Sequence, residues 1–238
     1  MAPADPIAAA ARNNALWCDA VCRSHGRPGV FDALMWCVPA GALPLYPDVV
    51  TLAGPSAAEA QRQAIGELLA DSRHRDWAIK DSYAALDLLP LGFRPLFDAS
   101  WIAWPDAQAG ASTGLQWRTI THSPDLTEWN AAWGENAPFT PPLLASSDLA
   151  FLAALRDGAQ VGGAVLNRGG GVVGVSNVFA HAPWHGQVWR DLPALAAGLF
   201  AGHRLVGYES GAGLEQASAA GFVSLGGLRV WQRLALDS

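Results

Sequence analysis

The sequence has little charge, a single lysine and no long uninterrupted apolar run. Charged residues make up 15% of the 238 residues, against about a quarter in a typical soluble domain. Lys80 is the only lysine among 15 basic residues, and the formal net charge is -6. A nucleic-acid surface needs clustered basic residues, so this composition argues against a nucleic-acid partner. No apolar stretch approaches the roughly 18 residues that a membrane-spanning helix needs, so none is predicted.

Cysteine is also scarce, with three residues in the chain. The first residues carry an acid and no basic segment, so they do not resemble a secretory signal, and a cytoplasmic protein with reduced thiols is expected. Cys18, Cys22, His25 and Cys37 could in principle form a zinc site. Structural zinc sites favour tighter cysteine pairs flanked by turns, whereas Cys18 and Cys22 are spaced like small buried residues of a helix. We therefore expect no metal.

Hydrophobic residues make up 51% of the chain, which excludes wholesale disorder and predicts a substantial core. The length fits one large domain or two small ones. A small, polar segment at residues 105–114 is the best candidate linker. It divides the chain into a loose tail at 1–14, an N-terminal half at 15–104 and a C-terminal domain at 115–238.

Apolar patterning and turn residues predict an alternation of strands and helices in both halves. In the N-terminal half, helices are expected at 13–24, 56–70 and 82–89, and strands at 48–52, 77–80 and 94–104. In the C-terminal half, helices are expected at 123–134, 192–201 and 213–220. Strands are expected at 115–120, 149–156, 160–166, 172–179 and 204–208, and a final strand pair or bent strand at 222–234. The 11 tryptophans are interpreted chiefly as packing residues.

Two stretches of the chain are similar to each other. Residues 82–96 and residues 210–225 each begin with serine, continue through a short predicted helix to Gly-Phe, and end in an apolar strand. The strand–helix–strand order upstream also matches between the two halves. Any α/β chain repeats strand–helix–strand, but the shared Gly-Phe and the near-constant spacing favour an internal duplication.

The C-terminal half resembles the GNAT superfamily of acyltransferases. The text that carries the resemblance is Leu205-Val-Gly-Tyr208-Glu-Ser210, a helix ending in Ala219-Ala-Gly221-Phe222, and Leu225-Gly-Gly-Leu-Arg229-Val-Trp231. The order of predicted elements from 115 to 234 is also that of the family. The resemblance implies an α/β fold with a mixed sheet, in which a tandem GNAT-like acyl-CoA acyltransferase has a truncated N-terminal copy.

The resemblance further implies a site for acetyl-CoA or another acyl-CoA. Its pantetheine arm would lie along residues 175–179, and a glycine-rich loop before the next helix would hold the pyrophosphate. The cofactor-binding candidates are Ser176, Val178, Phe179, His185, Gly186, Gln187, Trp189 and Arg190. The loop departs from the family pattern because only Gly186 remains of its glycines. We expect Asp191 at the helix start, where its charge would repel phosphate, and Pro193 in the first turn, where it would remove a backbone donor.

The catalytic candidates are Tyr208, Glu209 and Asn177. The resemblance implies a tyrosine as general acid to the leaving thiolate and a carboxylate as base. Asn177 lies in mid-strand, where asparagine is disfavoured, so a functional role or a bulge is expected there. The leading hypothesis is an N-acyltransferase acting on a small amine. The alternative is a non-catalytic GNAT-like binding module that has lost acyl-CoA, and a homodimer joined through exposed aromatic residues is a third hypothesis.

Overall fold

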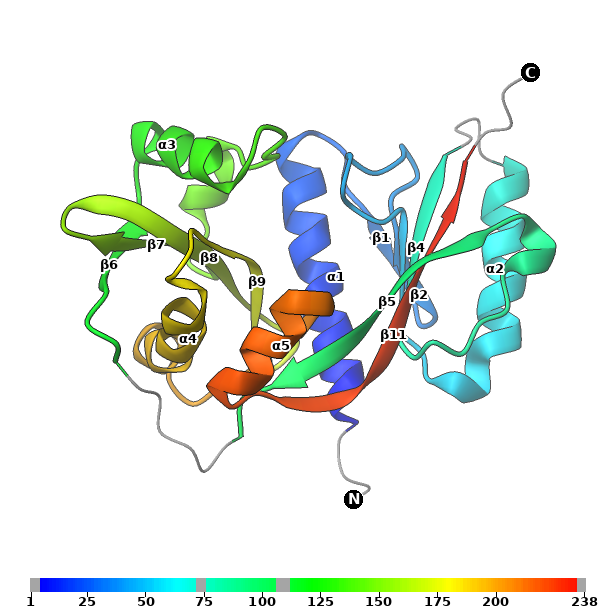
Figure 1. Cartoon of the computed structure of the whole chain (residues 1–238). Coiled ribbons are helices and arrows are strands. Elements are labelled where there is room, and N and C mark those ends of the chain that lie inside the picture. Colours follow the sequence, from blue (N-terminus) through cyan, green and yellow to red (C-terminus); the bar gives the residue numbers. More distant parts are fainter. Residues whose placement is uncertain (1–4, 72–75, 106–111, 235–238) are drawn as a thin grey trace. The chain divides into compact units, whose positions relative to one another are not determined.

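The computed structural model describes residues 5–71, 76–105 and 112–234. The chain forms two compact units (Figure 1): unit 1 is Met1–Ser100 with Gly226–Ser238, and unit 2 is Trp101–Leu225. The chain therefore crosses from one unit to the other inside two strands, β5 (Arg94–Ala103) and β11 (Val223–Arg233). These boundaries differ from the expected division at 105–114. Most of that expected linker, residues 106–111, lies outside the described residues.

Strand pairing explains why the end of the chain belongs to unit 1. β11 pairs antiparallel with β4 (Trp77–Asp81), in a register that runs from Arg229↔Asp81 to Arg233↔Trp77. Arg229 also forms an ion pair with Asp98 of β5. Such a pairing joins positions about 150 residues apart in sequence, so no local composition shift could reveal it.

The first helix, α1 (Pro6–Ser24), includes residues that were expected to form a loose tail. Asp5 caps this helix, since its side chain accepts a hydrogen bond of 2.9 Å from the backbone N–H of Ile7. Pro6 at the first helical position has the φ angle that a helix needs. Ala10 and Ala11 are fully buried, so this segment is part of the packed structure.

Unit 1 has a sheet in the order β1-β2-β3-β4-β11-β5. Its remaining elements are β1 (Val30–Phe31), β2 (Met35–Cys37), β3 (Val49–Thr51), a 3-10 turn (Pro55–Ala57) and α2 (Ala58–Asp71). Ile79 of β4 packs in a core with Ile65 of α2, whereas its neighbour Lys80 donates a hydrogen bond of 2.7 Å to Asn14 of α1. Because successive strand residues point to opposite faces, α1 and α2 cover opposite faces of this sheet.

One short helix expected in this unit, at 82–89, does not form. Asp81 at the end of β4 accepts hydrogen bonds from the backbone N–H groups of Tyr83 and Leu86, which holds the segment as a loop. Ala84 in this loop has a positive φ of 50°. A 3-10 turn at Leu89–Leu91 then leads to β5.

Unit 2 has its strands in the order β5-β10-β9-β8-β7-β6. They are β6 (Gln116–Ile120), β7 (Leu149–Arg156), β8 (Ala159–Gly169), β9 (Val172–Ala180) and β10 (Arg204–Glu209). The helices are α3 (Ser123–Trp133), a 3-10 turn (Pro141–Ala145), α4 (His185–Leu199) and α5 (Gly211–Ala220). The expected three-strand meander and the strand–helix–strand order through α4 are present, and β9 and β10 pair in parallel. The expected last strand also forms, but most of it belongs to unit 1.

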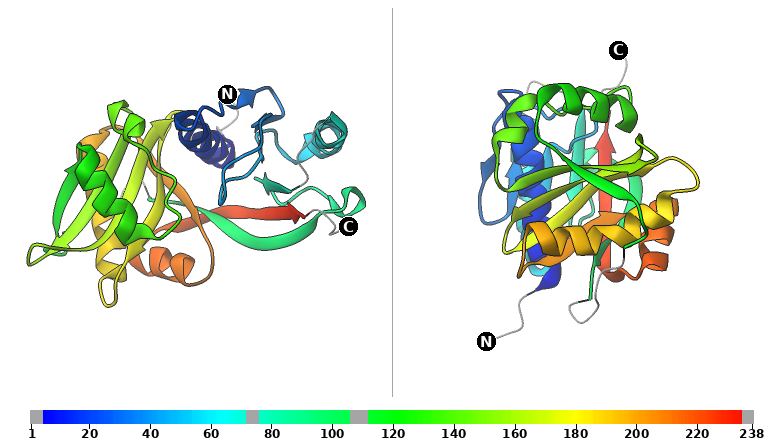
Figure 2. Two further views of the ribbon diagram at one scale, coloured as in Figure 1. Left: turned by 90° about the horizontal axis from the view of Figure 1, so that it is seen from above. Right: turned by 90° about the vertical axis from the view of Figure 1, so that its left-hand side faces the viewer.

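Helices cover both faces of the unit 2 sheet (Figure 2), and side chains form a core on each face. Alternate residues of β7, β8 and β9 pack against α4 and α5, with Trp189 and Leu192 buried among them. On the other face, Trp129 of α3 is fully buried and makes edge contacts with Phe151 and Phe179. Its indole N–H donates a hydrogen bond of 2.9 Å to the carbonyl oxygen of Leu152.

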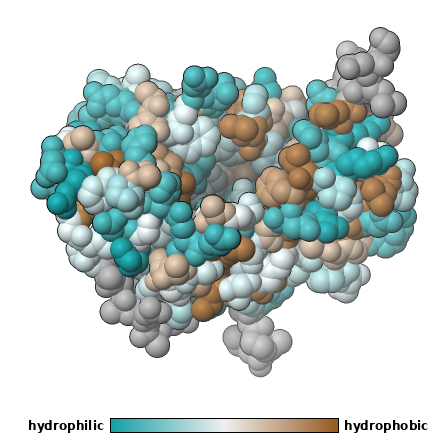
Figure 3. All heavy atoms as spheres, viewed as in Figure 1, coloured by the Kyte–Doolittle hydropathy of each residue, from teal (hydrophilic) through white to brown (hydrophobic). Residues whose placement is uncertain are grey.

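The surface viewed in Figure 3 shows apolar residues in small separate groups among polar ones. Across residues 5–71, 76–105 and 112–234, no helix combines the length and apolar character needed to cross a membrane. In the same ranges, no group of three or more His, Cys, Asp or Glu side chains is arranged to hold a metal ion.

Candidate functional site

The candidate site lies in unit 2, where β9 and β10 separate. Their parallel pairing runs from Arg204↔Val172 to Gly207↔Val175. Both strands continue past that point, to Ala180 and Glu209, without pairing with each other. Gly207 permits a close approach just before the separation, because a Cβ there would lie 2.8 Å from the carbonyl oxygen of Val175. The β9 backbone beyond Val175 is thus available for pairing with a bound molecule on this edge.

A β-bulge in β9 accompanies the separation. Val165 of β8 faces Ser176 and Gly163 faces Phe179, so two residues of β9 stand opposite Ala164 alone. Asn177 is one of these two and has a left-handed φ of 53°. The expected bulge at Asn177 is therefore confirmed. A bulge bends its strand and increases the local twist, which turns the end of β9 away from β10.

A cavity of about 200 Å³ lies beside the separated strand ends. Four elements of unit 2 surround it: the ends of β9 and β10 and the first two turns of α4 and α5. Its lining consists of Val178, Phe179, Ala180, His185, Trp189, Glu209, Ala212, Gly213 and Gln216. Of the expected site residues, the structure brings Val178, Phe179, His185, Trp189 and Glu209 together here.

Glu209 supplies the carboxyl group of this cavity. Burial raises its pKa from the ordinary 4.5 to about 7, opposed by a hydrogen bond from the backbone N–H of Ser210. Its side chain extends across Gly213 in the first turn of α5. A carboxyl with a pKa near neutrality can exchange a proton with a bound amine at physiological pH, which is what a general base must do.

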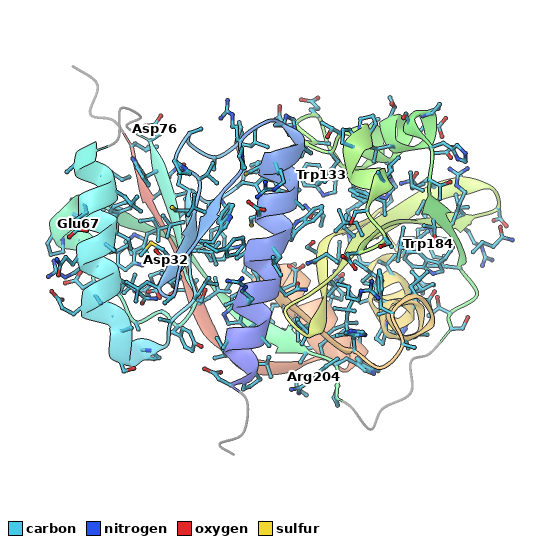
Figure 4. All side chains as sticks on the ribbon, turned by 180° about the vertical axis from the view of Figure 1, so that it is seen from behind. Asp32, Glu67, Asp76, Trp133, Trp184 and Arg204 are labelled. Carbon is cyan, nitrogen blue, oxygen red and sulfur yellow. The ribbon has the colours of Figure 1, made fainter. Side chains whose placement is uncertain are left out.

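The start of α4 forms a second wall. Trp184, labelled in Figure 4, precedes the helix, and His185, Gly186 and Gln187 form its first turn. The helix therefore begins seven residues before the expected start at Leu192. The first N–H groups of a helix lack partners within the helix and carry its positive dipole end, so they favour an anion such as a phosphate. Gly186 leaves this turn open, since a Cβ there would meet nothing within 4 Å.

Asp191 does not lie at the helix start, contrary to the sequence prediction. It belongs to the second turn of α4 and is 3% exposed. Its carboxylate accepts hydrogen bonds from the N–H and hydroxyl of Thr113 and from Nε1 of Trp117. Pro193 lies inside the helix rather than in its first turn. The two residues expected to oppose phosphate binding are therefore placed where they do not touch the open N-terminus.

Several expected site residues lie outside the cavity lining. Arg190 is exposed on the second turn of α4. Tyr208 contacts Trp101 edge-on, with ring centroids 5.6 Å apart. Since Tyr208 and Glu209 are adjacent in a strand, their side chains point to opposite faces, and the cavity receives only Glu209. Within the described part of the chain, Ser176 Oγ and Asn177 Oδ1 are buried without a hydrogen-bond partner.

Unit 1 contains a second parallel strand pair, β3 and β4, joined through α2. Its strand ends are joined by hydrogen bonds rather than separated. The backbone N–H of Ser82 donates to Thr51 Oγ1 at 2.8 Å, and the Ser82 hydroxyl donates to the carbonyl oxygen of Thr51 at 2.6 Å. Asp81, which precedes Ser82 as Glu209 precedes Ser210, is 1% exposed and satisfied by backbone N–H groups. The arrangement that opens the site of unit 2 is closed in unit 1.

Ala212, Gly213 and Gln216 were not anticipated as site residues. They lie on α5, whose sequence suggested only a short helix closed by Gly221. The available signal was the pair of glycines directly after Ser210, which is unusual at the start of a helix.

Comparisons with known proteins identify the fold. No family model and no curated protein matches the sequence. Among solved structures, the chain is similar to a GCN5-related N-acetyltransferase from Kribbella flavida, with 15% identity, a TM-score of 0.62 and coverage of 95% of this chain and 96% of that one. A GCN5-related N-acetyltransferase from Sphaerobacter thermophilus shares 16% identity with a TM-score of 0.53, covering 98% and 96%.

A functionally unknown conserved protein from Staphylococcus epidermidis is also similar, with 9% identity, a TM-score of 0.59 and coverage of 87% and 93%. These likenesses extend over nearly the whole chain, so they include both units. At such low identities they establish the architecture. The chain has the GNAT fold, a mixed α/β fold, as the sequence resemblance implied.

Proposed function

We propose that the protein is an N-acyltransferase that moves an acetyl or related acyl group from acyl-CoA to a small amine. The observation that carries this proposal is the placement of Glu209, with its pKa raised to about 7, in the cavity beside the separated ends of β9 and β10. The GNAT fold and the open first turn of α4 support it.

Each part of the cavity matches one part of the reaction. The free edge of β9 after Val175 would pair with the amide groups of the pantetheine arm, and its N–H groups would polarise the thioester carbonyl. The start of α4 would hold the pyrophosphate through the backbone N–H groups of His185 and Gly186, while the N–H of Gln187 donates to the carbonyl oxygen of Trp184. Because Asp191 is directed into the protein, no carboxylate of that helix opposes the phosphate charge.

The chemical step is direct transfer. Glu209 accepts a proton from the ammonium form of the acceptor, and the neutral nitrogen attacks the thioester carbon. As the carbon–sulfur bond breaks, the attacking nitrogen gives up a second proton and CoA leaves as a thiolate that takes up a proton, so the products are the amide and the free CoA thiol. The hypothesis that Tyr208 supplies this proton stays a prediction, which Tyr208→Phe tests. A role of Asn177 at the bulge likewise stays a prediction, tested by Asn177→Ala.

Isothermal titration with acetyl-CoA tests the proposal. We expect one acetyl-CoA per chain, because the strand ends of unit 1 are closed by Thr51 and Ser82. Glu209→Gln should retain binding and lose transfer to amines, since it removes the base but leaves the β9 edge and α4 intact. Gly198→Ala is the matched control, because Gly198 lies on α4 with open space around it. Absence of heat and of a raised Tm at millimolar acetyl-CoA would contradict the proposal.

The second candidate function is a GNAT-like binding module without catalysis. It is favoured by the reduced loop, in which Gly186 alone remains of the family's glycines. In that case a small molecule would occupy the cavity beside Glu209, and acetyl-CoA would give no signal in the titration. The same experiment therefore separates the two functions.

We further propose that unit 1 derives from a duplicated and shortened GNAT-like copy. Both units contain a parallel βαβ element, β3–α2–β4 in one and β9–α4–β10 in the other. Each is followed by a carboxylate, a serine, a Gly-Phe pair and a long strand. In the first copy the helix before Gly-Phe is reduced to the 3-10 turn Leu89–Leu91. An acyl-CoA site is then expected in unit 2 and not in unit 1.

A further inference from the structure

We propose that Gly213 is a positioning residue for the proposed acyl transfer: its missing side chain provides the space in which the Glu209 carboxyl lies over the first turn of α5. This inference rests on the proposed function for its meaning, but the geometry can be tested without any activity. Gly213 lines the cavity but has no side chain to offer the substrate, so it acts through Glu209.

The geometry at Gly213 is specific to one side chain. A Cβ at residue 213 would overlap Oε2 of Glu209, lie 3.1 Å from its Cδ and lie 3.8 Å from its Cγ. All three neighbours thus belong to Glu209, and the first two distances are shorter than ordinary van der Waals contact. A methyl group at this position and the present rotamer of Glu209 cannot coexist.

Nothing else in the backbone requires glycine at this position. Gly211, two residues earlier, has a left-handed φ of 50°, which favours glycine by itself. Gly213 has no such angle and lies inside α5, where any L-residue fits the backbone. Glycine within a helix costs about 1 kcal/mol relative to alanine. The space needed by Glu209 accounts for a residue that helix propensity disfavours.

The position of the carboxyl also fixes its surroundings. At the end of β10 it accepts a hydrogen bond from the Ser210 N–H, and it faces the cavity between α4 and α5. Among the described residues that line this cavity, His185 on the first turn of α4 is the only other titratable side chain. Displacing the carboxyl toward solvent would lower its desolvation, which is the largest cause of its raised pKa.

The test is a carbon-13 NMR titration of the Glu209 carboxyl in the wild-type protein, Gly213→Ala and Gly198→Ala. Glu209→Gln assigns the resonance. In Gly213→Ala the midpoint should move down from about 7 toward the ordinary value for glutamate, and in Gly198→Ala it should not move. This measurement reports Glu209 separately from His185 and requires no substrate.

A stability cycle guards against misfolding of the variant. At pH 5, where the Glu209 carboxyl is protonated and has no charge to desolvate, Gly213→Ala should change the Tm less favourably with Glu209 present than in a Glu209→Ala background. In a Glu209→Ala background the three atoms nearest to the added methyl are gone, so Gly213→Ala should leave the Tm unchanged or raise it through helix propensity. Equal effects in both backgrounds, or an unmoved titration midpoint, would overturn the inference.

Kinetics then tests the catalytic consequence. Gly213→Ala should lower kcat for amine acylation by about 100-fold, the effect of a small misplacement of a catalytic group, with little change in acetyl-CoA affinity. Glu209→Asp, one methylene shorter, should remove most of the penalty, so that adding Gly213→Ala to Glu209→Asp changes kcat little. If no acyl transfer is found at all, the proposed function fails, while the titration and the Tm cycle still decide the geometry.

Discussion

Trp117 donates a hydrogen bond of 2.8 Å from its indole nitrogen to Oδ2 of Asp191. This bond joins β6 to the second turn of α4, at positions 74 residues apart in sequence. Together with the two bonds from Thr113, it holds the Asp191 carboxylate inside unit 2. The N-terminus of α4 thereby remains free of an opposing charge, which the proposed phosphate contact requires.

We predict that Asp191→Ala destabilises the protein by about 3 kcal/mol. It would leave three donors of Thr113 and Trp117 without their buried acceptor, and each such loss costs about 1–3 kcal/mol with partial compensation. Trp117→Phe, which removes one bond and keeps most of the ring, should cost less. Urea denaturation measures both. If Asp191→Ala left the free energy of unfolding unchanged, these hydrogen bonds would not be what holds the start of α4.

We predict that Glu209→Gln lowers kcat for amine acylation by about 10²–10⁴-fold, the usual contribution of a general base. In the wild-type protein, kcat/KM should rise with pH through about 7, because only the deprotonated carboxylate of the free enzyme accepts a proton. In Glu209→Gln this rise of the rate with pH should disappear. Initial rates between pH 5 and 9 provide the measurement. If the rise with pH persisted unchanged in Glu209→Gln, another titrating group would be its cause.

Although Glu209→Gln should lower the rate of acyl transfer, we predict that it raises the free energy of unfolding at high pH. Between the ordinary pKa of 4.5 and about 7, the folded protein holds a proton that the unfolded chain has released. The free energy of unfolding therefore falls as pH rises through this window. Glutamine carries no charge to desolvate, so Glu209→Gln should be more stable than wild type at pH 8, by on the order of 2 kcal/mol, with little difference at pH 4. Urea denaturation at the two pH values checks the sign.

We predict that Gly163→Ala strongly destabilises unit 2. A Cβ at this position of β8 would lie 2.6 Å from the Leu152 carbonyl oxygen and 2.7 Å from both Phe179 Cε1 and Trp129 Nε1. Overpacking of this kind costs about 1–3 kcal/mol. Gly198→Ala, in the open on α4, should instead stabilise by up to about 1 kcal/mol. Comparing the Tm of the two variants separates crowding from the general effect of replacing glycine.

The sequence predicted unit 2 well because its signals are local. Asp157-Gly158 and the turn before Val172 mark the hairpins of the meander, and Gly221 ends α5 in a left-handed conformation. Asparagine in a strand at 177 indicated a functional role or a bulge. These features depend on turn chemistry and backbone preference within a few residues, so they can be inferred without the fold.

The start of α4 was missed for a physical reason. Asp191 and Pro193 each resemble residues of a helix beginning, and the sequence does not show that Asp191 has a buried partner. Trp117 and Thr113, which supply that partner, lie more than 70 residues earlier. Propensity therefore favoured a start near Leu192, while tertiary hydrogen bonds allow the helix to begin at His185.

By itself, the sequence determined most of the order of strands and helices and the GNAT-like ending around residues 205–231, because each is encoded by neighbouring residues; β1, β2 and the loop in place of a helix at 82–89 were not foreseen. Only the tertiary structure decided that the last strand completes unit 1 and that Tyr208 and Glu209 point to opposite faces of β10. It also decided that Gly213 lies beneath the Glu209 carboxyl. These relationships depend on strand pairing and on which side chains meet across a cavity, and neither is written in local sequence.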